Sequence, residues 1–164
     1  MMVSRALLLL MLGLLPGCGR GGMASCEQDR RQAQAVLEKD KRVARISHEA
    51  DQLALQGRPR QAADRIEADA KIPMDEAISA AKAWKPQTVW GAERAKDLLA
   101  LTEQRRQRLT AYVTALRSEQ LTKVVEQMEL QRDLEKQALE VEKTLSAGPQ
   151  TADACAILPD STGQ

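Results

Sequence analysis

The sequence predicts an all-α protein: an elongated antiparallel helical hairpin or coiled coil whose first arm is interrupted. Aromatic residues make up 2% of the chain, with no Phe, while charged residues make up 29%. This composition is typical of long helices, and a core with so few aromatic rings is thin and built from aliphatic side chains. Apolar residues also recur at steps of three, four or seven, which is the mark of one buried helical face.

The first arm is expected to begin with a helix over residues 26–56. Ser25 and Gln28 have the spacing of a capping box, which places the helix start at Cys26. Asp40 and Ser47 interrupt the apolar face of this helix. The apolar positions of that face are Ala33, Val36, Leu37, Val43, Ile46, Ala50 and Leu53.

A second helix is expected over residues 59–84. Gly57 suits the C-terminal cap of the first helix, and Pro59 suits the first position of the next one. Pro73 predicts a kink or restart at residue 73, because proline removes a hydrogen bond and clashes with the preceding turn.

The second arm is expected to be one helix over residues 88–146. Lys85–Thr88 forms a turn, and Thr88 is the candidate N-cap. A helix of about 58 residues is about 87 Å long. Its apolar rhythm is weakest at Thr102, Arg105 and Gln120. Gly148 ends the helix, and residues 148–164 form a tail that carries Cys155.

A rival architecture, a three-helix bundle, remains open. Gly57-Arg58-Pro59 reverses the chain in that reading, so that the first two helices form a short antiparallel pair. Ala50, Leu53, Gly57, Ala62 and Ile66 resemble the spacing of a tetratricopeptide repeat. Only one such unit is visible, whereas about three are needed to stack stably, so the interrupted hairpin is favoured.

The N-terminus has the order of a secretory signal. Arg5 precedes an apolar run over residues 6–15, which is too short to span about 30 Å of hydrocarbon. Leu15, Gly17 and Cys18 then occupy the positions of a Leu-x-Gly-Cys lipobox. In these residues the chain resembles a bacterial lipoprotein precursor.

That resemblance implies a signal peptide over residues 1–17 and lipidation of Cys18. Cys18 would carry a diacylglycerol on its thiol and an acyl chain on its amine, at the start of a flexible linker over residues 18–25. Gly19 in place of aspartate implies sorting to the outer membrane, facing the periplasm. The alternative is ordinary secretion with cleavage after Ala24.

The net charge of the chain limits the classes of partner that are expected. Without the signal, 23 basic residues face 23 acidic ones, because only Arg5 is removed. A neutral chain argues against nucleic acid as a partner. The expected partners are the membrane, through the lipid, and an envelope protein, with homo-oligomerisation through the long helix as a further expectation.

Lipidation of Cys18 leaves Cys26 and Cys155, and an even pair outside the cytoplasm favours a disulfide over two free thiols. The two arms of the predicted hairpin have equal length, so a disulfide between these two cysteines would close the open end of the hairpin. The resulting register pairs Val36 with Leu145, Val43 with Ala138, Leu53 with Met128, and Ile66 with Ala115.

No catalytic or metal site is expected. The single histidine, His48, lies next to Glu49 and near Asp51, but a solvated helix surface explains it better than a metal. No phosphate loop, nucleophile elbow or zinc motif occurs. The chain is therefore not expected to be an enzyme, and no cofactor is expected besides the lipid.

Two groups of residues are candidates for partner binding. Trp84 and Trp90 flank the turn and either cap the hairpin tip by packing on Leu98 or form a binding hot spot. Arg105, Arg106 and Arg108 make a basic stretch that is either solvated or contacts an acidic partner. The hairpin would point its Trp84–Trp90 tip away from the membrane.

Together these features favour a non-catalytic envelope lipoprotein that acts as a helical scaffold or adaptor. A small regulatory, inhibitor or immunity lipoprotein, or a component of a lysis or secretion system, is the alternative.

Overall fold

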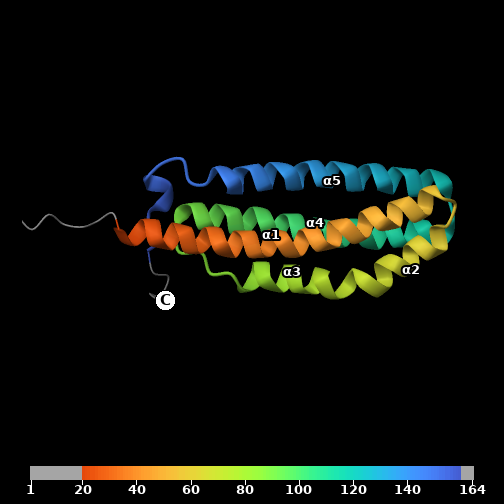
Figure 1. Ribbon diagram of the computed structural model, residues 1–164, viewed down its shortest axis with the longest axis horizontal. Helices are drawn as coiled ribbons and strands as arrows, with labels where there is room; N and C mark the ends of the chain where they lie inside the picture. The colour runs from red at the N-terminus through yellow and green to blue at the C-terminus, as the bar shows by residue number, and fades with distance from the viewer. Residues whose placement is uncertain (1–19, 160–164) are drawn as a thin grey trace, which may run out of the picture.

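The computed structural model describes residues 20–159, which form five α-helices and one short 3-10 helix (Figure 1). The predicted signal and the lipidation of Cys18 lie outside the described residues. The all-α class is confirmed. The elements are α1 (Arg20–Leu55), α2 (Pro59–Asp69), α3 (Lys71–Ala83), α4 (Val89–Ser118), α5 (Leu121–Ala147) and η1 (Asp153–Cys155).

α1 and α4 run one way along the long axis of the bundle, and α2, α3 and α5 run the other way (Figure 1). α1 and α4 form the central pair, α2 and α3 flank it on one side, and α5 flanks it on the other. Within the described residues, α5 does not pack on α2 or α3. Antiparallel hairpin packing is confirmed, and each arm of the predicted hairpin is itself folded back.

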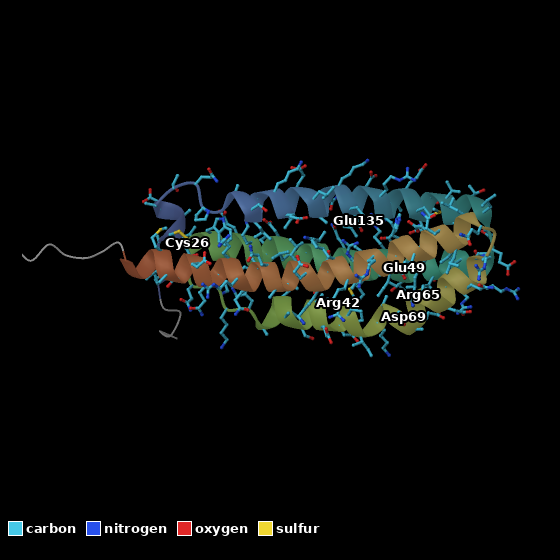
Figure 2. All side chains as sticks on the ribbon, in the orientation of Figure 1. Cys26, Arg42, Glu49, Arg65, Asp69 and Glu135 are labelled. Carbon is cyan, nitrogen blue, oxygen red and sulfur yellow. A yellow bond between two sulfur atoms is a disulfide. The ribbon has the colours of Figure 1, made fainter. Side chains whose placement is uncertain are left out.

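The first reversal lies at Gly57, as the rival architecture required. Gly57 adopts φ +75°, a left-handed conformation that glycine reaches without strain from a Cβ atom. The N–H of Arg58 donates to the carbonyl of Leu53 at 3.0 Å, which closes the helix end. Pro59 then opens α2, as predicted. An ion pair of 2.6 Å joins Arg65 of α2 to Glu49 of α1 at the surface (Figure 2).

The prediction of a single helix over residues 88–146 is wrong. α4 ends at Ser118, Glu119 adopts a left-handed conformation with φ +54°, and α5 begins at Leu121. No Gly or Pro marks the break, although Gln120 is one of the weak points in the apolar rhythm. The physical reason is burial, because folding back lets α5 cover the central pair with Val124, Met128, Leu134 and Leu145. The single long helix through which homo-oligomerisation was expected is therefore not formed.

Both arms fold back at matching positions, so the antiparallel register between them survives. The N-terminal half of α1 still faces the C-terminal half of α5, and α2 and α3 still face α4. Three ion pairs follow this register: Lys41–Glu142 at 2.6 Å, Asp64–Arg117 at 2.7 Å and Lys82–Glu103 at 3.2 Å.

Helix ends mostly agree with the sequence. Thr88 caps α4 by accepting a hydrogen bond from the N–H of Gly91, and Gly148 ends α5 with φ +67°. Pro73 lies in the first turn of α3, after a break at Ala70, so the predicted restart is confirmed. The start of α1 at Arg20 rather than Cys26 is a correction. Residues 20–25 of the expected flexible linker are therefore helical.

The core consists of two apolar clusters with a polar layer between them. One cluster lies toward the disulfide end and includes Leu37, Leu101 and Leu134, while the other lies toward the far end. Buried polar side chains separate the two clusters on the three helices that face each other: Asp40 on α1, Thr102 and Arg105 on α4, and Gln131 on α5.

Candidate functional site

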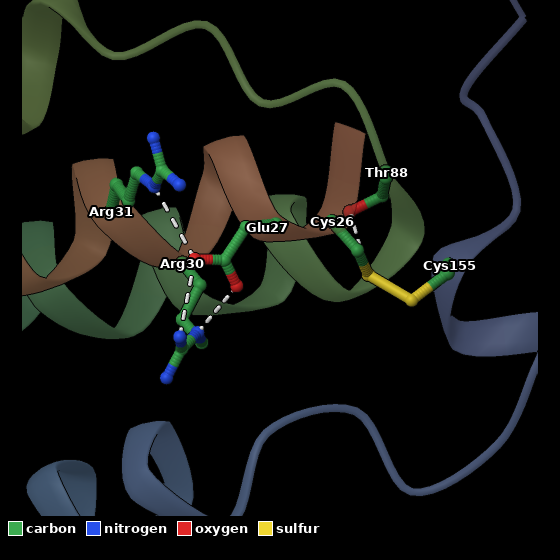
Figure 3. A network of polar contacts seen from close by, with 6 residues as sticks. All are labelled: Cys26, Glu27, Arg30, Arg31, Thr88 and Cys155. Atoms are coloured by element: carbon green, nitrogen blue, oxygen red, sulfur yellow. Dashed lines mark hydrogen bonds and ion pairs between the residues drawn. A yellow bond between two sulfur atoms is a disulfide. The ribbon is translucent and has the colours of Figure 1, made fainter. Parts of the chain in front are cut away.

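A disulfide between Cys26 and Cys155 closes one end of the bundle, as predicted (Figure 3). Their Cα atoms lie 5.4 Å apart, and both residues are buried. Cys26 lies near the start of α1, and η1 carries Cys155. Because the chain passes four times along the long axis, in α1, in α2 with α3, in α4 and in α5, it returns to the end where it started, and both cysteines lie there. Thr88 Oγ1 is 3.9 Å from the sulfur of Cys26, so the α3–α4 connection also lies there.

Asp29, which is 1% exposed, ties that connection to α1. Its carboxylate accepts hydrogen bonds from Trp84 Nε1 at 3.2 Å, from the N–H of Gln87 at 3.0 Å, and from Thr88 N and Oγ1 at 2.9 and 2.7 Å. Gly91 allows this approach, because a Cβ atom there would lie 2.1 Å from Asp29 Oδ2. Sequence reasoning missed Asp29, since nothing local separates it from the solvated acidic residues of α1.

The expectation that Trp84 and Trp90 sit at a tip remote from the cysteines is wrong. The two folded arms return the 85–88 turn to the disulfide end. Trp84 and Trp90 are 7% and 5% exposed, so neither ring is available as a surface hot spot. Both tryptophans belong to the same apolar cluster as Leu98, which agrees with the packing interpretation.

Arg105 also departs from its expected place on a basic surface. Its side chain is fully buried and pairs with Asp40 of α1 at 2.7 Å and with Glu135 of α5. Burial by itself lowers the pKa of Arg105, but the two carboxylates more than reverse this effect, so its pKa is raised and it stays charged. Arg106 and Arg108 are exposed, and the basic stretch is thereby reduced to these two residues.

Large apolar side chains are exposed at both ends of the bundle: Met23, Val89 and Ile157 lie at the disulfide end, and three others lie at the remote end. Leu55 ends α1 and is 69% exposed, Leu121 begins α5 and is 74% exposed, and Val125 follows one turn later at 45%. We call these three residues the distal patch. Arg58 lies in the adjoining α1–α2 turn, where its side chain donates hydrogen bonds to Gln56 and Gln61. The patch offers apolar contact next to a positive charge.

A polar cleft opens between α1 and α5 midway along the bundle. His48 and Asp51 of α1 and Gln131 and Arg132 of α5 contribute to its lining. Burial raises the pKa of Asp51 above its usual value, and Tyr112, His48 and Arg132 offset part of that rise. Within residues 20–159, no group of three His, Cys, Asp or Glu side chains is arranged to hold a metal ion.

No protein family, curated protein or solved structure matches this chain. A search of the described helices for a stretch long and apolar enough to cross a bilayer found none. The functional assignment therefore rests on the residues of the chain itself.

Proposed function

We propose that this protein is a lipid-anchored, non-catalytic scaffold or adaptor of the bacterial envelope that holds a protein partner at its distal patch. The observation that carries the proposal is the separation of roles along one axis. The N-terminal end of the bundle is locked by a disulfide and by Asp29, while the opposite end exposes Leu55 and Leu121.

The disulfide end of the bundle is well placed for attachment to a membrane. The lipobox cysteine, Cys18, lies two residues before α1 in the sequence, so a lipid on it would be joined to the bundle with little slack. α1 has 36 residues, which gives a length of about 54 Å at 1.5 Å per residue. A bundle of this length carries its far end well clear of a membrane surface, which is what an adaptor requires.

The distal patch suits a protein partner. Exposed apolar side chains that lie together mark interaction sites more often than scattered ones do. Leu55, Leu121 and Val125 come from two helices that meet at one end, and Arg58 adds a charge for specificity.

Site-specific photocrosslinking in cells tests the proposal. A photoreactive residue at position 55 or 121 should give one discrete crosslinked product, whereas one at Leu139 should not. Leu139 is the matched control, because it is 55% exposed and apolar but lies mid-way along α5.

The product should disappear in Leu121→Asp and persist in Leu139→Asp, with membrane attachment unchanged in both. Cys18→Ser should release the protein from membranes without altering its helical content. A crosslinking pattern that is the same at positions 55, 121 and 139 would contradict the distal patch, and attachment that survives Cys18→Ser would contradict the anchor.

A further inference from the structure

Three large apolar side chains are exposed at the disulfide end of the bundle. Met23 lies in the first turn of α1 and is 61% exposed, Val89 begins α4 and is 42% exposed, and Ile157 follows η1 and is 58% exposed. We call these three residues the proximal patch. Single exposed apolar residues are normal on a protein surface, so their meaning depends on whether the three share one face.

Backbone contacts hold the three segments of the proximal patch against one another. A Cβ atom on Gly22 would lie 2.7 Å from the carbonyl oxygen of Cys155, which places the chain beside Met23 against η1. The N–H of Val89 donates to the carbonyl oxygen of Ala156 at 3.1 Å, one residue before the exposed isoleucine. The disulfide joins α1 to η1 covalently (Figure 3). The patch is therefore one surface built from three fixed segments.

The surface around the proximal patch carries almost no charge. Charged residues make up 29% of the chain, yet residues 22–26, 86–92 and 147–159, which form this end, include one charged side chain, that of Asp153. Because ionised groups are costly to bring into an apolar medium, such a surface is suited to contact with lipid. The opposite end differs, since residues 55–60 and 117–123 carry five charged side chains: Arg58, Arg60, Arg117, Glu119 and Lys123.

The position of the anchor favours lipid over protein as the occupant of this surface. Cys18 lies two residues before α1 and five residues before Met23. Five residues span at most about 18 Å even when fully extended, and an interfacial apolar face sinks about 5–10 Å into the boundary between headgroups and acyl chains. A lipid on Cys18 therefore holds the patch within reach of the bilayer and leaves little room for a protein between them.

We propose that the proximal patch docks on the lipid bilayer, with Met23, Val89 and Ile157 in the boundary between headgroups and acyl chains. This inference rests on the lipid anchor of the proposed function and adds a second contact with the membrane, made by the protein itself. The lipid alone leaves the bundle free to tilt, whereas the docked patch makes it stand on the membrane with the distal patch directed away.

Fluorescence quenching in vesicles tests the docking. The lipidated chain is reconstituted in vesicles of phosphatidylethanolamine and phosphatidylglycerol, in which some lipids carry a spin-label quencher near the top of the acyl chain. A fluorescent amino acid at position 157 should lose its emission to the quencher, whereas one at position 121 should keep it. Leu121 is the matched control, because it is apolar and 74% exposed but begins α5. The 27 residues of α5 separate the two ends of that helix by about 40 Å.

Charged variants should undock the bundle without releasing the lipid. Met23→Asp with Val89→Asp should lower the ratio of docked to undocked protein roughly tenfold or more, because both changes remove apolar contact and add a charge that lipid excludes. Quenching at position 157 should fall accordingly. Leu121→Asp with Leu139→Asp places the same charges on exposed apolar positions elsewhere and should leave this quenching unchanged. Helical circular dichroism should be retained in both double variants.

Flotation with the vesicles separates the docking from the anchor. A protein that floats but is quenched equally at positions 157 and 121 has its anchor without the docked orientation, which overturns this inference alone. A protein that does not float lacks the anchor. The Cys18→Ser chain, held by an N-terminal histidine tag on nickel-chelating lipids, then gives the same comparison, and equal quenching there overturns the docking. Undiminished quenching at position 157 in Met23→Asp with Val89→Asp would also overturn it.

Discussion

Arg105 of α4 donates two hydrogen bonds to Asp40 of α1, from Nε to Oδ1 at 2.7 Å and from Nη2 to Oδ2 at 2.8 Å. Neither side chain is more than 1% exposed, and the pair lies between the two apolar clusters. Two charges are costly to remove from water, so such a pair fixes which helix faces are in contact more than it adds net stability. Here it sets the alignment of the two parallel helices at the centre of the bundle.

Removing one partner should be far more harmful than removing both. Asp40→Leu leaves the guanidinium of Arg105 with only Glu135 and should lower the free energy of unfolding by about 3–5 kcal/mol. The double variant with Arg105→Met should recover most of that loss or exceed the wild type. Urea unfolding of the four proteins in this cycle measures the coupling, and additive losses would show that the pair does not hold the helices in register.

Breaking the disulfide should destabilise the bundle strongly without changing its topology. The bond joins residues 129 apart in sequence, and closing a loop of that size stabilises by about 4–5 kcal/mol in the chain-entropy model. Cys26→Ala with Cys155→Ala should lower the urea midpoint, and reductant should lower it equally in the wild type. Helical circular dichroism should be retained in dilute buffer. An unchanged midpoint would mean that the bond does not form.

Gly91→Ala should disturb the disulfide end specifically. The added Cβ would lie 2.1 Å from Asp29 Oδ2, so the carboxylate must move away from Trp84 and Thr88. Overpacking of this kind costs about 1–3 kcal/mol, and tryptophan fluorescence should change with it. Gly57→Ala is the control, because it is strained by its φ of +75° but lies at the other end, where a Cβ meets nothing within 4 Å. It should destabilise the bundle while leaving the fluorescence unchanged.

Asp51→Asn should stabilise the fold in a pH-dependent way. Burial raises the pKa of Asp51 in the folded state, so folding favours its protonated form. The wild type therefore loses stability as pH rises through that raised pKa, and it retains this stability below the unfolded value of about 3.9. Melting curves should show the variant ahead of the wild type at about pH 7 and the difference vanishing toward about pH 4. A difference that grows on acidification would contradict this sign.

In the sequence, the buried polar residues of the bundle can be recognised only as interruptions of the apolar helix faces. Asp40 and Ser47 interrupt the apolar face of α1, and Thr102 and Arg105 interrupt that of α4. Each interruption is ambiguous alone, because a polar residue on an apolar stripe can equally mark the edge of the buried face. Only the packing of α1 beside α4 turns Asp40 and Arg105 into one ion pair.

The sequence by itself indicated the helical class and the caps at Gly57, Thr88 and Gly148, and it favoured a bond between Cys26 and Cys155 once the lipobox resemblance set Cys18 aside. These features depend on local backbone preferences and on a count of cysteines. The tertiary structure decided the reversal at Glu119, because a non-glycine residue accepts a left-handed conformation only where burial of α5 offsets its cost. That reversal placed Trp84 and Trp90 beside the cysteines and left Leu55 and Leu121 at the free end.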